Sequence, residues 1–235
     1  MLNSFRSFIL TFHWTDLLQP QWYIHNGGLF LLLFVVFAET GLFAGFFLPG
    51  DSLLFVAGIY SNSLAAWLYD SGSDITNLFM IISLVTIAGI AGNTVGYWFG
   101  EKSGPALYKR QDSIFFRQKY LRQAKKFYEE NGGFTIFIAR FIPFVRTFAP
   151  IVAGVVQMDY KKFMFYNVAG CIAWSSSMIA AGHYLHKFLL NKYNFDLTHH
   201  LELIVLGIVL VTLLPIFLKI YHARTNKDET EEDAK

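Results

Sequence analysis

Residues 137–154 read FIARFIPFVRTFAPIVAG, and they place Arg140 and Arg146 in a run whose other members carry no formal charge. Pro143 lies between the two arginines, and Pro150 follows them. Proline removes a helical hydrogen bond, and a break at membrane depth is tolerated only where protein or a water-filled cavity covers the freed backbone groups. We therefore predict that this stretch enters and leaves a membrane from one side, as a re-entrant hairpin.

The composition explains why a membrane is the relevant solvent. Of the 235 residues, 54% are hydrophobic and 15% are charged, whereas about 25% of the residues of an ordinary soluble domain are charged. The chain is therefore expected to be an all-α, polytopic integral membrane protein. The net charge of +2 is too small to indicate a nucleic-acid partner. Cys171 is the only cysteine, which excludes an intramolecular disulfide and a thiolate metal cluster.

Apolar stretches divide the chain into two kinds of membrane segment. About 20 apolar residues span a bilayer core, and spanning helices are predicted at 77–100, 163–186 and 200–221. Two further stretches, 28–60 and 134–158, are broken by proline and glycine and are predicted to be re-entrant. A spanning helix to residue 47 followed by a short half-helix is the competing interpretation of the first. The residues expected to shape the two loops are Pro49, Gly50, Pro143, Pro150 and Gly154.

Three parts of the chain lie outside these segments. Residues 1–27 are predicted to form an amphipathic interfacial segment, because polar residues break the apolar run and no small-residue cleavage site follows it. The basic connection 101–133 carries apolar residues at intervals, which indicates an amphipathic helix closed by Gly132 or Gly133. The polar, acidic tail 222–235 is expected to be disordered.

The distribution of charge predicts the orientation. The connection 101–133 holds eight lysines and arginines, whereas 61–76 holds Asp70 and Asp74 and neither lysine nor arginine. The positive-inside rule then places the first connection in the cytoplasm and the second outside. Two opposed re-entrant loops keep every basic cluster, and the C-terminus, on the cytoplasmic side. The location of the N-terminus stays open.

The two broken stretches resemble each other. FLPGDSLLFVAGIY at 47–60 is echoed by FIPFVRTFAPIVAGVV at 141–156, each with F-x-P and then V-A-G. The match is weak residue by residue, but the opposite orientations inferred from charge make it the pattern of an inverted-topology repeat. Transport sites in such proteins lie between two broken helices near the membrane midplane.

Four charged residues fall within the broken stretches and form the candidate site: Glu39 and Asp51 in the first, Arg140 and Arg146 in the second. Charges at membrane depth are costly and usually have partners, so we expect both arginines to face the carboxylates. Arginine offers a planar fork of donors that suits phosphate oxygens, and carboxylates in low dielectric can exchange protons near neutral pH. The alternative is an ion-pair network that only ties the two halves together.

Three motifs together, FAETGLFAGFFLPGDSLLFVAG, AGNTVGYWFGEKSG and FIARFIPFVRTFAPIVAG, resemble the DedA family, the bacterial branch of the SNARE-associated or VTT-domain membrane proteins. The resemblance covers residues 28–186. It implies a bacterial cytoplasmic-membrane protein that moves lipid across the bilayer, either a polyprenyl phosphate such as undecaprenyl phosphate or a phospholipid, with dependence on the proton-motive force. The family's acidic and arginine pairs fall on the four residues named above. Asn93 stands where many members have an acidic residue.

The resemblance predicts a flippase or scramblase, not an enzyme, and no cofactor or metal is expected. The runner-up is an intramembrane enzyme acting on lipid phosphates, for which His183 and His186 are weak candidates because no Ser or Asp constellation is evident. A structural membrane protein is the third class. Gly92, Gly96, Gly100 and Gly104 form a small-residue ladder, for which packing within the monomer is favoured over a homodimer seam.

Overall fold

The computed structural model describes residues 20–41, 50–109 and 132–197, together with 123, 125, 126, 128, 130 and 207. Its helices are α2 (Pro20–Gly41), α3 (Gly50–Ile59), α4 (Ser61–Ala65), α5 (Asp74–Lys109), α7 (Phe134–Ala139), α8 (Pro143–Val155) and α9 (Tyr160–Tyr193). No strand occurs in these described residues. The predicted all-α class is therefore confirmed.

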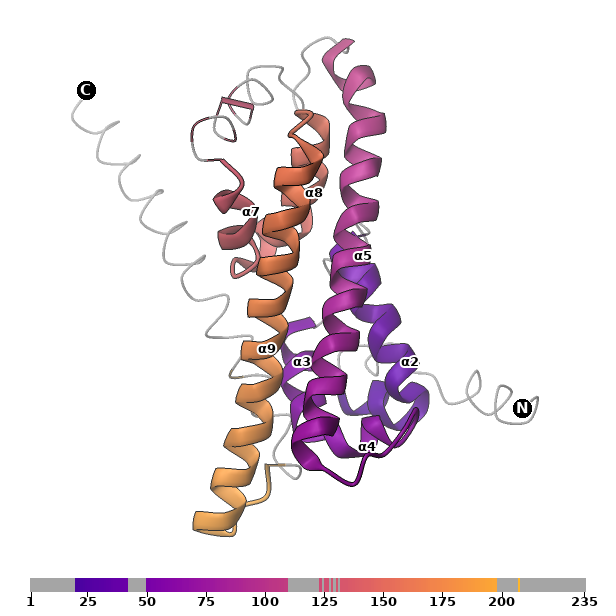
Figure 1. Cartoon of the computed structure of the whole chain (residues 1–235), viewed down its shortest axis with the longest axis vertical. Helices are drawn as coiled ribbons and strands as arrows, with labels where there is room; N and C mark the ends of the chain where they lie inside the picture. Colours follow the sequence, from indigo (N-terminus) through magenta and orange to yellow (C-terminus); the bar gives the residue numbers. More distant parts are fainter. Residues whose placement is uncertain are drawn as a thin grey trace, which may run out of the picture.

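Two long antiparallel helices, α5 and α9, run side by side through the molecule (Figure 1). Asp74–Ala106 and Tyr160–Tyr193 are long and apolar enough to cross a membrane, and they contain the spanning segments predicted at 77–100 and 163–186. A helix of this length is about 50 Å long and so extends beyond a hydrocarbon core of about 30 Å. The remaining predicted spanning helix, 200–221, lies almost wholly outside the described residues.

Local chemistry sets where these helices begin and end. Asp159 caps α9, since its side chain accepts from the backbone N–H of Lys162 over 2.9 Å, and Asn194 ends α9 in the left-handed conformation with φ 50°. Gly132 adopts φ 64° and its N–H donates to the carbonyl of Tyr128 over 3.0 Å, an arrangement that ends helices. The helical turn before α7 thus ends at Gly132, one of the two positions predicted for the end of the helix in the basic connection.

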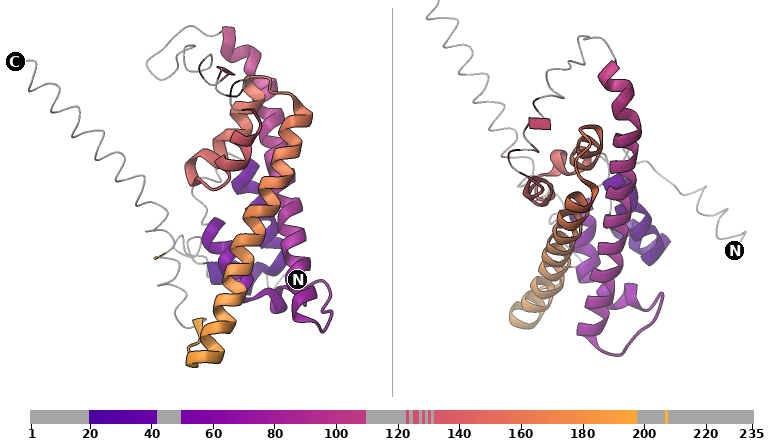
Figure 2. Two further views of the ribbon diagram at one scale, coloured as in Figure 1. Left: turned by 60° about the vertical axis from the view of Figure 1, so that its left-hand side comes forward. Right: turned by 45° about the horizontal axis from the view of Figure 1, so that its top comes forward.

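The short helices lie toward opposite ends of the α5–α9 pair. Helices α2, α3 and α4 pack on the half nearer the start of α5, and α7 and α8 on the half nearer the start of α9 (Figures 1 and 2). α3, α8 and the part of α2 after Gly28 are too short to span by themselves. Gly28 interrupts α2 with φ 52°, and a side chain there would overlap the ring of Trp67.

Close glycine contacts fasten α3 to α9. A β-carbon at Gly58 would lie 2.1 Å from the carbonyl oxygen of Ile179, and one at Gly182 would lie 2.0 Å from that of Phe55. Atoms cannot approach so closely, so only glycine allows these two backbones to touch. Small residues serve this purpose in helix pairs within membranes.

The same crossed pattern fastens α8 to α5. A β-carbon at Gly154 would lie 2.0 Å from the carbonyl oxygen of Tyr97, and one at Gly100 would lie 2.0 Å from that of Ile151. In both helix pairs each glycine meets the carbonyl three residues before the other glycine. Gly154, predicted to shape the second loop, thus allows close packing of α8 on α5.

The glycine ladder of α5 is covered by the chain's own helices. Gly92 meets Thr40 of α2, Gly96 and Gly100 meet Ile151 of α8, and Gly104 meets Val155 of α8. The prediction of packing within the monomer is confirmed for all four positions. This face of α5 therefore has no room for a second copy of the chain.

Two apolar cores lie on either side of the molecular centre. The larger core joins α2, α3 and α4 to α5 and α9 and includes Leu32, Leu53, Leu54 and Ile179, all fully buried. The smaller core joins α7 and α8 to α5 and α9 and includes Tyr97, Ile136, Ala153 and Phe163. The charged residues lie between the two.

Candidate functional site

The two acidic residues of the site face each other across the break between α2 and α3. Glu39 lies near the end of α2 and is 2% exposed, and Asp51 lies in the first turn of α3. Gly50 makes the approach possible, because a β-carbon there would lie 1.6 Å from Oε2 of Glu39. A side chain at Gly50 would therefore displace the carboxylate of Glu39. Pro49 lies outside the described residues.

Arg146 of α8 bridges both carboxylates. Its Nη1 donates to Oδ1 of Asp51 and its Nη2 to Oε1 of Glu39, and the arginine is 7% exposed. The fork-shaped guanidinium suits such a double contact. One side chain therefore joins the two short helices of one half of the molecule to the short helix of the other half.

Trp174 of α9 is a member of the site that the sequence analysis missed. Its Nε1 donates to Oδ1 of Asp51 over 2.8 Å. Its ring lies 4.8 Å from the guanidinium carbon of Arg140 and 5.2 Å from that of Arg146, distances at which an aromatic face attracts a cation. Tryptophan in spanning helices is typical of the membrane interface, so its position in the middle of α9 was the available signal.

Arg140 departs from the expected pairing with the carboxylates. It lies between α7 and α8 and is 3% exposed, yet none of its three guanidinium nitrogens has a hydrogen-bond partner among the described residues. Gly89 of α5 leaves room for it, since a β-carbon there would lie 2.7 Å from Nη2. Arg140 therefore makes no hydrogen bond to the acidic pair, and its three guanidinium nitrogens are buried without an acceptor among the described residues.

Amides occupy the place where the resemblance predicted a third carboxylate. Asn93 lies one turn after Gly89 on α5, and its Nδ2 donates to Oδ1 of Asn167 over 2.5 Å. Cys171 also donates to that oxygen over 3.4 Å and is buried. The Oδ1 atom of Asn93 is buried without a partner among the described residues. Two groups near Gly89 thus lack partners among the described residues: the guanidinium of Arg140, which lies beside Gly89, and Oδ1 of Asn93, one turn further along α5.

A second polar cluster surrounds His183, and it corrects the view that no Ser or Asp accompanies this histidine. Nδ1 of His183 lies 2.9 Å from Oγ of Ser61, and Nε2 lies 3.0 Å from Oδ2 of Asp74. A hydrolase triad has the hydroxyl at Nε2 and the carboxylate at Nδ1; here they are exchanged. Ser61 is also 1% exposed, which leaves no room for a substrate at its oxygen. His186 instead lies 3.9 Å from Asp196.

The connection before α5 is ordered by side-chain hydrogen bonds. The amide of Asn77 and the backbone N–H of Gly72 both donate to the carboxylate of Asp70, and they hold the pKa of Asp70 below its usual value. Both donors favour the ionised form. This connection therefore keeps its negative charge.

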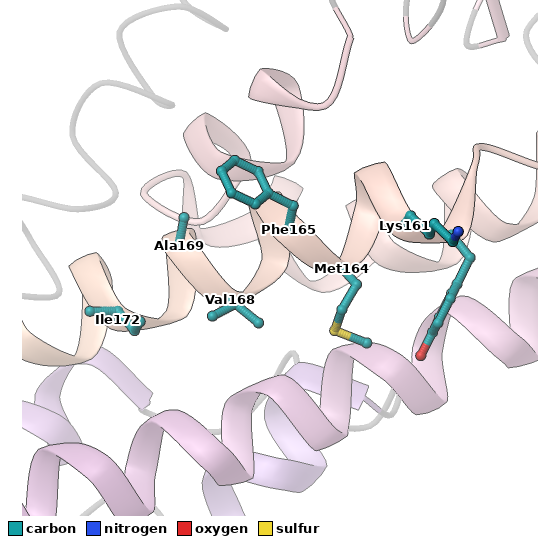
Figure 3. A pocket seen from close by; sticks show the side chains of 7 residues that line it. Lys161, Met164, Phe165, Val168, Ala169 and Ile172 are labelled. Atoms are coloured by element: carbon teal, nitrogen blue, oxygen red, sulfur yellow. The ribbon is translucent and has the colours of Figure 1, made fainter.

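An apolar groove of about 540 Å³ lies on the outer face of α9, between Tyr160 and Ile172. Figure 3 shows Met164, Phe165, Val168 and Ile172 along it, with Lys161 at one end. No member of the charged site lines this groove. Within the described ranges, no group of three His, Cys, Asp or Glu side chains could hold a metal ion.

Comparison with known proteins decides the family. Residues 28–184 match the model of the VTT domain, and the chain is 40% identical over 190 residues to Protein DedA of Escherichia coli K12, covering 81% of this chain and 80% of the relative. The chain belongs to the DedA family. It is accordingly a membrane protein, in agreement with its two long apolar helices.

Other relatives of this DedA-family protein cover at least two thirds of the chain. It is 34% identical over 227 residues to the uncharacterized membrane protein Rv0364 of Mycobacterium tuberculosis, with 93% of each chain covered. It is 30% identical over 162 residues to the inner membrane protein YqjA of Escherichia coli K12, with 68% of this chain and 69% of the relative covered. No solved structure matches the chain.

Proposed function

We propose that this DedA-family protein moves an anionic lipid across the cytoplasmic membrane of a bacterium, as a flippase or scramblase coupled to protons. The observation that carries the proposal is the unequal state of two buried arginines. Arg146 neutralises Glu39 and Asp51, while Arg140 lies nearby with three guanidinium nitrogens that have no hydrogen-bond partner among the described residues. A site of this kind has a place for a proton and a place for an anion.

The opposed re-entrant loops are the structural part of the proposal. The α2–α3 and α7–α8 segments are each broken near a buried charge and lie at opposite halves of the α5–α9 pair. The crossed glycine contacts of α3 with α9 recur between α8 and α5, as expected of an inverted repeat. The basic connection and the C-terminus would then face the cytoplasm.

The arginines provide the lipid-phosphate site. An unpaired charge at membrane depth costs between about 2.5 and 17 kcal/mol, so a ligand that supplied acceptors to Arg140 would recover much of that cost. Phosphate oxygens suit the planar guanidinium. The guanidinium carbons of Arg140 and Arg146 both lie close to the ring of Trp174, at 4.8 Å and 5.2 Å, so a phosphate bound to the first would also interact with the charge of the second.

The carboxylates provide the proton site, and charge balance couples them to the lipid. With Glu39 and Asp51 ionised, the two arginines leave the cluster neutral. Uptake of one proton by either carboxylate gives the cluster a net positive charge, which a phosphate monoanion cancels. Because net charge in low dielectric is costly, proton and lipid phosphate favour each other's binding. Protonation also weakens one arm of the Arg146 bridge and frees the two halves to move.

Two alternatives give different measurable results. An intramembrane lipid-phosphate enzyme would release phosphate. A structural membrane protein would neither release phosphate nor exchange lipid between leaflets. The exchanged geometry and the burial of Ser61 at His183 argue against the first. A protein that needs only to tie its two halves together has no use for the unpaired donors of Arg140, which argues against the second.

Reconstitution in liposomes tests the proposal. Purified protein in vesicles with labelled polyprenyl phosphate or labelled phospholipid should exchange the lipid between leaflets without releasing phosphate, and an Arg140→Gln variant should not. Phosphate release that an Arg146→Ala variant abolishes would instead identify an enzyme. Absence of exchange for every lipid, with and without a proton gradient, would favour the structural class.

Labelling tests the orientation. In a Cys171→Ala background, a cysteine replacing the exposed Tyr69 should react with an impermeant reagent added outside intact cells, and one replacing the exposed Lys102 should not. Equal reaction of both positions would contradict the opposed loops.

A further inference from the structure

A row of polar pairs follows the contact between α5 and α9. The pairs recur about every second turn of α9, from the charged site to the end of the molecule that carries Asp70. They are Asn93 with Asn167 at 2.5 Å, Thr86 with Ser175 at 2.6 Å, and Asp74 with His183 at 3.0 Å. Hydroxyl groups pair across helices in membrane proteins, whereas ionisable groups there are costly, have partners and mark ion or proton paths.

At its outer end this row becomes a chain of contacts leading inward from the surface. The side-chain exposure falls from 47% at Lys187 to 30% at Asp74 and 4% at His183, and Ser61 beyond it is 1% exposed. Lys187 donates to Asp74, Asp74 contacts Nε2 of His183, and Nδ1 of His183 contacts Ser61. An aqueous proton can therefore reach a buried imidazole through a partly exposed carboxylate.

The groups around His183 suit proton transfer through the ring. Both ring nitrogens have partners, so a proton can arrive at one nitrogen while another leaves from the other. Among the described residues, the charged and titratable neighbours are Asp74 from α5 and Lys187 and Tyr184 from α9. α4 contributes the Ser61 hydroxyl, and α3 approaches with the backbone of Gly58.

An apolar plug separates this inlet from the charged site. Ile179 lies one turn from His183 and one from Ser175 and is fully buried. The backbone of α3 touches its carbonyl at Gly58, which leaves no space for water between the helices. The row is thus closed at Ile179, as a coupled transporter requires if protons are not to leak.

We propose that Asp74 and His183 form the proton inlet of this protein on the side opposite the basic connection, an inference that rests on the proposed proton-coupled function. A proton taken up by Asp74 passes to Nε2 of His183 and leaves an imidazolium paired with an ionised carboxylate. The imidazolium then passes its Nδ1 proton to Oγ of Ser61 while the Ser61 hydroxyl gives up its own proton to a water molecule. Movement at Ile179 admits this water, which carries the proton on to Glu39 or Asp51.

The test compares two histidines one turn apart. Wild type, His183→Gln and the control His186→Gln are reconstituted in vesicles of phosphatidylethanolamine and phosphatidylglycerol containing labelled polyprenyl phosphate. Leaflet exchange is followed with and without an imposed proton gradient, and thermal unfolding is recorded for each protein. We expect His183→Gln to lose the acceleration by the gradient while it still exchanges lipid without one, and His186→Gln to respond as wild type does.

Since His183 is buried, Asp74→Asn provides a second variant, which removes the proton-binding group but keeps an acceptor for Lys187 at the surface. Loss of the gradient response in Asp74→Asn, with the unfolding temperature of wild type, supports the inlet even if His183→Gln does not fold. A full gradient response in either folded variant overturns it. Wild-type vesicles without exchange under any gradient overturn the proposed function, and the inlet with it.

Discussion

Trp174 donates a hydrogen bond from its indole nitrogen to the carboxylate of Asp51 over 2.8 Å, and this contact joins the middle of α9 to the first turn of α3. Asp51 also accepts from Arg146, so three helices meet at one carboxylate. The tryptophan orients the acidic group and at the same time presents its ring to both arginines.

A Trp174→Phe substitution isolates the hydrogen bond, because it keeps an aromatic ring at the position. A hydrogen bond to a charged group contributes about 1.5–3 kcal/mol, and we expect the free energy of unfolding in detergent to fall by an amount in this range. Trp98→Phe, on an exposed face of α5, is the control and should leave stability unchanged. Equal effects of the two substitutions would show that the contact with Asp51 is not stabilising.

Removal of the charge should destabilise the protein far more at Arg146 than at Arg140. Arg146→Gln leaves two buried carboxylates without their cation, and breaking a buried pair in this way costs about 3–5 kcal/mol. Arg140→Gln removes a charge that has no hydrogen-bond partner among the described residues and should destabilise much less, while it abolishes binding of a phosphorylated lipid. Unfolding curves and lipid binding for both variants check this, and a larger loss of stability in Arg140→Gln would refute the division.

The long helices, the breaks and the candidate charges could be predicted from the sequence. The segments that became α5 and α9 were predictable, because a long unbroken apolar run has few other solutions in a membrane. The breaks at Gly50 and Pro143 were predictable because proline, at positions 49 and 143, interrupts helical hydrogen bonding. The candidate charges were recognisable because ionised groups in such runs are rare.

The partners of those charges were not predictable. Glu39 and Arg146 are 107 positions apart in the chain, and Asp51 and Trp174 are 123 apart. Which of two arginines reaches the carboxylates depends on how α8 packs against α5, and this packing includes long-range glycine contacts such as Gly100 with Ile151. The Ser61–His183–Asp74 cluster likewise forms only when the starts of α4 and α5 meet the second half of α9.

The glycine contacts can be tested within one helix. A β-carbon at Gly100 would lie 2.0 Å from a backbone oxygen of Ile151, whereas one at Gly96 would meet its nearest atom at 3.5 Å. Gly100→Ala should therefore force α5 and α8 apart and cost about 1–3 kcal/mol. Gly96→Ala should be neutral or stabilising by up to about 1 kcal/mol. Unfolding in detergent measures both, and equal stability of the two variants would contradict the close packing.

Asp70 should make stability depend on pH in the acid range. Hydrogen bonds from Asn77 and Gly72 hold the pKa of Asp70 below its usual value. A lowered folded pKa means that the contribution is fully present above the unfolded pKa of about 3.9 and is lost as the pH falls through the lower, folded value. Asp70→Asn should remove this acid-side dependence. An unchanged pH profile of the unfolding midpoint would rule the contribution out.

The substitution Asn93→Asp tests whether the guanidinium of Arg140 binds the lipid phosphate. A carboxylate at this position, one turn from Gly89 and beside Cys171, would lie close enough to attract the guanidinium and compete with a bound phosphate. One charge-assisted hydrogen bond is worth about 1.5–3 kcal/mol, so affinity for a phosphorylated lipid should fall at least about tenfold while thermal stability holds or rises. Asn167→Asp is the matched control on α9, because Asn167 already accepts from Asn93 and Cys171. Affinity that is unchanged in Asn93→Asp would place the phosphate away from Arg140 and Asn93.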